Sequence, residues 1–288
     1  MEKAILKTLI YADIFDYPLF AYEIHKWLIE KEASIEQIEK KLNKLVRDKK
    51  ISQKEEMFFL RGKKNLIEKR LANEKTSHQF YGKAQWVSQF FRIIPWVQLV
   101  GISGSLAMRN ADKNADIDLF VVTRKNRVWL SRLFCALILE LLGQRRKRGE
   151  SRILGAGKIC LNLLISEDVL EQSNKNLYIA HEVLQMKVLW EREKTYQKFL
   201  EHNSWTKKYL PNWIGMSAVE RQLGNYSRQT WIAGDFFEKV LGFLQRRYMG
   251  KIKGDEVIKQ RSLYFHPEDS GVEVLRTYQL KVKKLFGK

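Results

Sequence analysis

Two adjoining stretches decide the fold of this 288-residue chain: Val100-Gly-Ile-Ser-Gly-Ser-Leu-Ala-Met-Arg109 and Ala115-Asp-Ile-Asp-Leu-Phe-Val-Val-Thr123. Each contains an apolar run rich in β-branched residues, and the uninterrupted run Leu119–Val122 is typical of a buried strand. Gly104-Ser105 lies between the runs and predicts a turn that opens a short helix. The quoted sequence therefore predicts strand, short helix and strand.

The residues that follow extend this order. Arg127–Leu142 is apolar enough for a buried helix, and Lys158–Ile165 reads as a third strand after Val97–Ser103 and Asp116–Thr123. Strand, helix, strand, helix, strand is the order of an α/β (α+β) core with a mixed sheet. We place this core at residues 95–168.

Two carboxylates lie on the second predicted strand. Asp116 and Asp118 are two residues apart, so both side chains point to one face of the strand. Carboxylates held together among apolar residues repel each other, and hard oxygen ligands of this kind select Mg²⁺ or Mn²⁺. Gly104 lets the backbone approach a phosphate closely, and Ser105 can donate a hydrogen bond to it. The pattern predicts a metal and triphosphate site.

The spacing of these residues resembles the DNA polymerase β-like nucleotidyltransferase superfamily. The resemblance rests on Gly104-Ser105 after a strand and on Asp116-Ile-Asp118 on the next strand, and it covers roughly residues 97–166. It implies Mg²⁺-dependent transfer of a nucleoside monophosphate from a nucleoside triphosphate (NTP). Asp116 and Asp118 would be the catalytic metal ligands, and Gly104 and Ser105 would bind the triphosphate. RNA ends, protein hydroxyls and small molecules all remain open as acceptors.

The connection between the motifs carries further polar residues. Arg109 and Lys113 are candidates to neutralise a bound triphosphate, with plain solvation as the alternative. Asp112 and Asn114 are predicted to cap the turn rather than to bind metal.

The third predicted strand departs from the superfamily, which places a further acid there. Its central polar residue is Asn162, and a neutral amide cannot act as a general base near neutral pH. Three explanations stay open: the acceptor is more acidic than an alcohol, the protein is slow or inactive, or another acid folds into the site. The candidates for that acid are Glu167, Asp168 and Glu182.

Residues 1–64 resemble a winged helix in the order of their elements. Helices are predicted at Ala4–Asp13, Ala21–Lys31 and after Ser34, and short strands at Ile51–Lys54 and Met57–Leu60. The exposed face of the third helix mixes acids with bases, so protein packing competes with DNA reading as its role. Residues 65–94 are predicted to be connecting helices.

Residues 169–288 are predicted to form a helical C-terminal domain. Its expected helices cover residues 177–191, 196–205, 217–249 and 271–285. The first would place His181, Glu182 and Gln185 near one face, where they are candidates for nucleotide or acceptor contact.

Charge is the unusual feature of the composition. The chain carries 52 basic and 33 acidic residues, a formal net charge of +19, and the segment 66–166 alone holds 17 basic and 7 acidic residues. The run Arg145-Arg-Lys-Arg148 adds a basic loop beside the third strand. Such an excess of positive charge favours a polyphosphate ligand and leaves RNA or another nucleic acid open as a partner.

The cysteines and the length of the apolar runs indicate the expected cellular location of the protein. Cys135 and Cys160 both lie in apolar stretches, which is typical of free thiols in a reducing compartment. No signal peptide is recognisable, and no apolar run approaches the roughly 20 residues that cross a bilayer. We therefore expect a cytoplasmic protein without a membrane partner.

The sequence leaves two functions open. The first is a nucleotidyltransferase that uses an NTP and Mg²⁺ or Mn²⁺, including one that modifies a partner protein. The alternative is a catalytically degenerate relative that acts as a nucleic-acid-binding or regulatory module. Asn162 is the feature that separates them.

Overall fold

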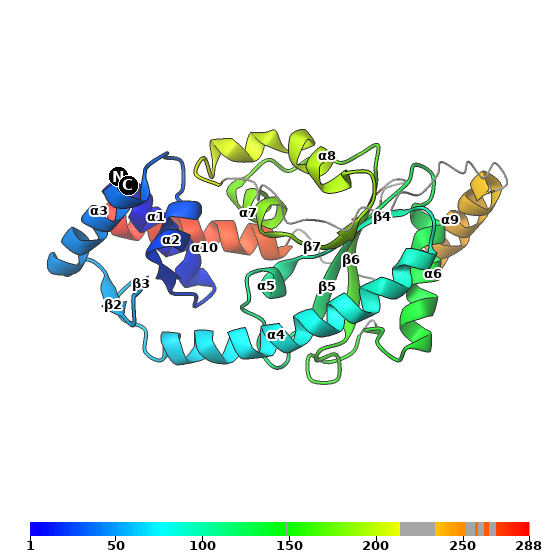
Figure 1. The fold of residues 1–288 in the computed structure, drawn as a ribbon, viewed down its shortest axis with the longest axis horizontal. Coiled ribbons are helices and arrows are strands. Elements are labelled where there is room, and N and C mark those ends of the chain that lie inside the picture. The colour runs from blue at the N-terminus through cyan, green and yellow to red at the C-terminus, as the bar shows by residue number, and fades with distance from the viewer. Residues whose placement is uncertain (148, 214–233, 251–256, 259–261, 265–268, 288) are drawn as a thin grey trace.

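The computed structural model describes residues 1–147, 149–213, 234–250, 257–258, 262–264 and 269–287 (Figure 1). Its centre is a six-stranded sheet in the order β7-β4-β5-β6-β9-β8. Among the strands in these ranges only β5 and β6 pair in parallel, so the sheet is mixed, and the protein is α+β. The strands are β4 (Val97–Ile102), β5 (Ile117–Thr123), β6 (Ile159–Ser166), β7 (Lys187–Glu191), β8 (Val257–Ile258) and β9 (Ser262–Tyr264).

The predicted core elements form close to their expected bounds. Strands β4, β5 and β6 are the three strands read from the sequence, and α6 (Val128–Leu141) is the buried helix between β5 and β6. The run Leu119–Val122 is buried throughout, as an apolar strand covered on both faces must be. The motif helix α5 (Gly104–Ala107) follows β4 directly.

The prediction of a wholly helical segment after residue 168 is wrong. Helix α7 (Leu177–Gln185) ends at an extended Met186, and the next residues form β7, which pairs with the free edge of β4. The apolar Val188-Leu-Trp190 suits either a helix or a strand, and the open edge of β4 decides for the strand. Strands β8 and β9 extend the other edge of the sheet.

The other C-terminal elements are helical. They are α8 (Thr195–His202), the 3₁₀ turn η2 (Ser204–Lys208), α9 (Gly234–Gly250) and α10 (Asp269–Phe286). Part of the helix predicted over 217–249 lies outside the described residues. No helix in the described ranges has the length and apolar character needed to cross a membrane.

The N-terminal segment contains the three helices and the hairpin read from the sequence. These are α1 (Glu2–Ile14), α2 (Ala21–Lys26), α3 (Ile35–Arg47), β2 (Ser52–Lys54) and β3 (Met57–Phe59). Ser34 caps α3 by accepting the Gln37 backbone N–H, and the Gln37 side-chain oxygen accepts the Ser34 backbone N–H, as predicted. Helix α2 is shorter than expected, and a further strand, β1 (Leu19–Phe20), pairs with β3.

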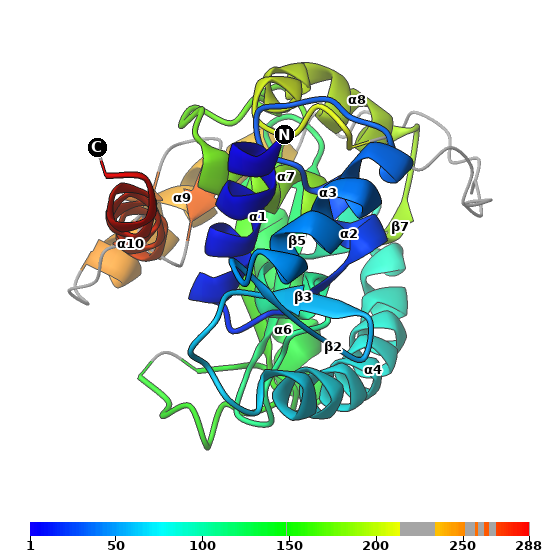
Figure 2. The same ribbon diagram turned by 90° about the vertical axis from the view of Figure 1, so that its left-hand side faces the viewer.

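Two helices join the N-terminal segment to the sheet. The 25-residue α4 (Leu66–Phe90) runs from the hairpin along the sheet and continues into η1 (Phe91–Ile93) (Figure 1). Its buried Arg70 donates to both carboxylate oxygens of Glu23. Helix α10 returns to pack against α1 and α7 (Figure 2), and Lys281 forms an ion pair with Asp13. Helix α10, near the C-terminus, thus links the N-terminal helix α1 to α7.

Candidate functional site

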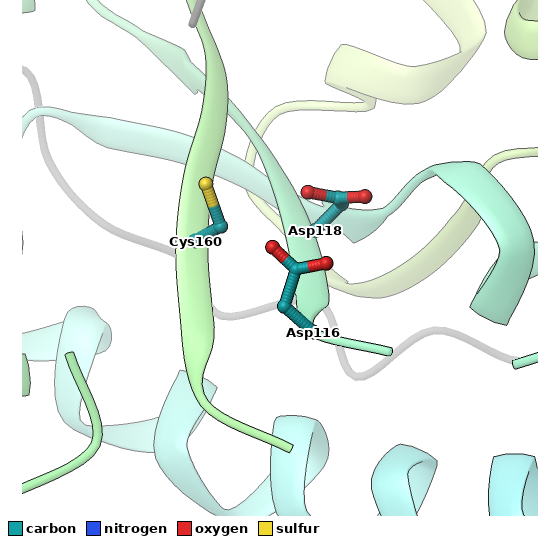
Figure 3. Close-up of side chains that lie close together, drawn as sticks. All are labelled: Asp116, Asp118 and Cys160. Atoms are coloured by element: carbon teal, nitrogen blue, oxygen red, sulfur yellow. The ribbon is translucent and has the colours of Figure 1, made fainter. Parts of the chain in front are cut away.

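Strand β5 brings the two predicted metal ligands together. Asp116 precedes β5 and Asp118 is its second residue, and both are partly buried. A third side chain, Cys160, comes from the parallel neighbour β6, where it is paired with Asp118 (Figure 3). One ligand atom of each residue lies within 4.8 Å of the others. The structure thus makes a compact group of two carboxylates and a thiol.

Asn162 does not occupy the position opposite the acids. Leu119 pairs with Leu161 while Phe120 pairs with Leu163, so Asn162 is an extra residue in β6 with no partner position in β5. This irregularity shifts the register by one residue, and Cys160 becomes the neighbour of Asp118. Sequence spacing alone could not reveal it, because a β-bulge leaves no fixed mark in the sequence.

Arg146 from the basic loop contacts the acids directly. Its guanidinium donates to the Asp116 carboxylate in a partly buried ion pair. Burial lowers the pKa of Arg146, but the hydrogen bond and charge of Asp116, with smaller contributions from Cys160 and Asp118, hold that pKa above its usual value. Arg145 and Lys147 instead pair with Glu140, and Arg148 lies outside the described residues.

Gly104 packs against the carboxylate of Asp118. Its φ of +64° is a left-handed conformation that favours glycine, and a Cβ at this position would lie 2.8 Å from Asp118 Oδ2. The motif glycine is therefore required for both its backbone conformation and its contact with the acid.

Gly104→Ala is expected to lower the free energy of unfolding by about 1–3 kcal/mol, because it adds a left-handed alanine and pushes Asp118 away. Chemical denaturation measures the loss. Gly143→Ala is the matched control, since Gly143 has the same φ of +64° but no neighbour within 4 Å of the place that a Cβ would take. An equal loss in both variants would show that the contact with Asp118 contributes nothing.

Glu182 is the candidate third acid that the fold brings to this motif. It lies on α7, and its carboxylate accepts a hydrogen bond from the Gly104 backbone N–H. Burial and then the negative charge of Asp118 raise the pKa of Glu182 to about 7, against the opposing effect of that hydrogen bond. Glu167 and Asp168 lie beyond the far end of β6, where Glu167 accepts from the Lys125 backbone.

The other predicted residues divide between the motif and its surroundings. Ser105 is exposed in the first turn of α5. Asp112 caps the turn as predicted, accepting the Asn114 backbone N–H at 2.8 Å, and Lys113 in the same turn is exposed. The pKa of Lys187 is lowered first by burial, then by the positive charge of Lys26 and then by that of Arg109.

Sequence reasoning missed three features of the site: Cys160 as a neighbour of the acids, Arg146 as the ion-pair partner of Asp116, and α1 as a neighbour of α7, where Tyr11 stacks on His181. The first two depend on strand register and loop path. The third depends on how the N-terminal segment packs, for which the local sequence holds no signal.

No family model, curated protein or solved structure matches the chain. The chemistry of the site itself is therefore the basis for assigning a function.

Proposed function

We propose that the protein is a metal-dependent nucleotidyltransferase of the DNA polymerase β-like type, which moves a nucleoside monophosphate from an NTP to an acceptor hydroxyl. The observation that carries this proposal is the meeting of Asp116 and Asp118 with the Gly104 turn, where Asp118 Oδ2 fills the space that a side chain at 104 would need. The antiparallel hairpin after α3 similarly supports a winged-helix-like N-terminal domain.

The donor set fits the metal that such transfer requires. Two carboxylates on one strand face suit Mg²⁺ or Mn²⁺, whereas a thiol is a ligand that Mg²⁺ does not select. We therefore assign Asp116 and Asp118 as ligands and leave Cys160 as a neighbour. A bound divalent ion would supply charge neutralisation for the phosphates at this position.

The protein's own groups take the other roles. The Gly104-Ser105 turn borders the acids and is assigned to the triphosphate. Glu182, held by the Gly104 N–H on the side of α7, is assigned to accept the proton of the attacking hydroxyl. Glu182 comes from helix α7 and not from the third strand, so it would take the role of the carboxylate that β6 lacks.

Arg146 competes with a metal ion for Asp116, since both are cations that need the same carboxylate. Arg146→Gln is therefore expected to tighten Mn²⁺ binding several-fold, because it removes a positive charge beside the ligands. Isothermal titration with Mn²⁺ measures the change. Arg145→Gln is the control, since Arg145 pairs with Glu140 instead; weaker Mn²⁺ binding in Arg146→Gln would contradict the competition.

Label transfer tests the proposed function. The purified chain is incubated with each α-³²P-labelled NTP, Mg²⁺ or Mn²⁺, and total RNA, protein or small-molecule extract. Transfer that is lost in Asp116→Asn and Asp118→Asn would support the enzyme, and the labelled fraction would identify the acceptor class. Absence of transfer, with NTP binding unaffected by either change, would overturn the proposal.

The basic charge favours a second candidate function. The segment 66–166 carries 17 basic and 7 acidic residues, and Cys160 stands where a carboxylate would complete the strand site. A non-catalytic nucleic-acid-binding protein would use the positive charge of this segment to bind phosphates and would not need Asp116 and Asp118. It would bind RNA with the same affinity in Asp118→Asn and transfer no label.

A further inference from the structure

A small cavity lies beside the proposed active site. Its volume is about 150 Å³, and it is lined by residues of α1, the segment that follows α1, the end of α2, α5 and α7. Gly104, Ser105 and Glu182 are among its wall residues, so it adjoins the motif that packs against Asp118. The cavity therefore reaches the proposed base.

Several other wall residues are aromatic. Tyr11 and Phe15 come from α1 and its end, and Trp27 comes from the end of α2. Tyr11 stacks on His181 with ring centroids 4.1 Å apart, and Trp27 lies 5.3 Å from the same ring. An apolar cavity of about 150 Å³ is known to accept a benzene-sized ligand. The walls and the volume together select one aromatic ring.

His181 adds a polar requirement to this cavity. The Gln185 side-chain amide lies 2.9 Å from His181 Nδ1, and an amide nitrogen can only donate. Burial lowers the pKa of His181 to about 3, so the ring is neutral and its proton is on Nε2. His181 is 4% exposed, and its Nε2 has no hydrogen-bond partner among the described residues.

A buried donor of this kind is unfavourable until an acceptor reaches it. His181 is a wall residue of the cavity, but its Nε2 is covered by the side chains around it, so a ligand oxygen inside the cavity meets this need once a neighbouring wall side chain moves aside. The cavity thus combines aromatic walls, a hydrogen-bond donor at His181 and a carboxylate at Glu182.

We propose that this cavity is the acceptor site of the enzyme and takes a single aromatic ring that carries a hydroxyl and a second oxygen. The inference rests on the proposed function, which it deepens by naming the acceptor class. The hydroxyl oxygen forms a bond to the α-phosphorus of the NTP, and the bond from that phosphorus to the β-phosphate oxygen breaks. Pyrophosphate leaves, and the hydroxyl proton passes to Glu182. The N-terminal segment thereby selects the acceptor.

Resorcinol is the probe, because its two hydroxyls can serve Glu182 and His181 at once. Ligand-observed NMR on the full chain should show that wild type binds resorcinol at least about tenfold more tightly than benzene, a difference of about 1.4 kcal/mol. His181→Phe keeps the ring and removes the donor, so it should weaken resorcinol binding about tenfold and leave benzene binding unchanged. Ala12→Phe fills the cavity and should abolish both.

Asp116→Asn is the control, since Asp116 does not line the cavity: it should bind resorcinol normally and transfer no label to it. Equal binding of benzene and resorcinol by wild type, or no binding of either, would overturn the inference without any variant. Transfer to another acceptor in that case would leave the proposed function standing. Resorcinol binding without transfer to any acceptor would overturn both the acceptor role and the proposed function.

Discussion

Asp118→Asn is expected to lower the rate of the proposed nucleotidyl transfer by on the order of 10³-fold, because the amide removes one of the two negative charges assigned to the metal ion. Asp118 lies between the Gly104 turn and Cys160, and strands β5 and β6 contain no other acid that could replace it. The substitution is nearly isosteric and leaves the buried strand intact. The defect should therefore appear in kcat and in Mn²⁺ affinity, and the unfolding midpoint should be no lower than that of wild type, because the repulsion between Asp118 and Glu182 is removed.

Single-turnover transfer assays and Mn²⁺ titration measure the two effects. Asp112→Asn is the matched control in the same region, since Asp112 caps the turn through Asn114 and an asparagine oxygen can accept the same hydrogen bond. Retention of more than a tenth of the wild-type rate in Asp118→Asn would contradict its role as a metal ligand.

Glu182→Gln is expected to slow transfer by about 10²-fold or more, since a glutamine cannot accept the hydroxyl proton. The same variant is expected to be more stable than wild type at pH 8 in metal-free buffer, by on the order of 2–3 kcal/mol. Glutamine keeps an acceptor for the Gly104 N–H but carries no charge beside Asp118. A slower but more stable protein is the signature of an acid retained for function at the expense of stability.

The raised pKa of Glu182 determines how the stability of wild type, relative to Glu182→Gln, changes with pH. Glu182 has a pKa of about 7 in the folded chain against a usual value of 4.5, so between those values the folded state keeps a proton that the unfolded state has released. The free energy of unfolding of wild type therefore falls as the pH rises from 4.5 to 7 and remains low above pH 7. Below pH 4.5 both states are protonated, and the variant and wild type converge.

Urea denaturation at pH 4.5, 6 and 8 measures this difference, with Glu167→Gln as the control because Glu167 lies at the far end of β6. A stability gap between Glu182→Gln and wild type that does not grow with pH would refute the assigned environment of Glu182. Full activity in Glu182→Gln would refute its role as proton acceptor.

Sequence reasoning performed best where the signal is local. Ser34 and Gln37 mark the start of α3, the apolar runs mark β4, β5 and β6, and the two-residue spacing of Asp116 and Asp118 fixes their shared face. It performed worst in the segment after residue 168, where an apolar run was assigned to the wrong element. Residues 187–191 adopt a strand because β4 offers an unpaired edge, which lies some 85 residues earlier in the chain.

Sequence alone thus determined the elements of the core and the residues of the acid pair, because helix and strand periodicity and spacing along one strand are properties of neighbouring residues. Tertiary structure alone decided which groups surround the pair. A one-residue register shift placed Cys160 beside Asp118, a loop returned Arg146 to Asp116, and the packing of α7 and α1 brought Glu182 and the aromatic cavity to Gly104. These contacts join residues far apart in the chain, and their energies depend on burial and mutual charge that exist only once the chain has folded.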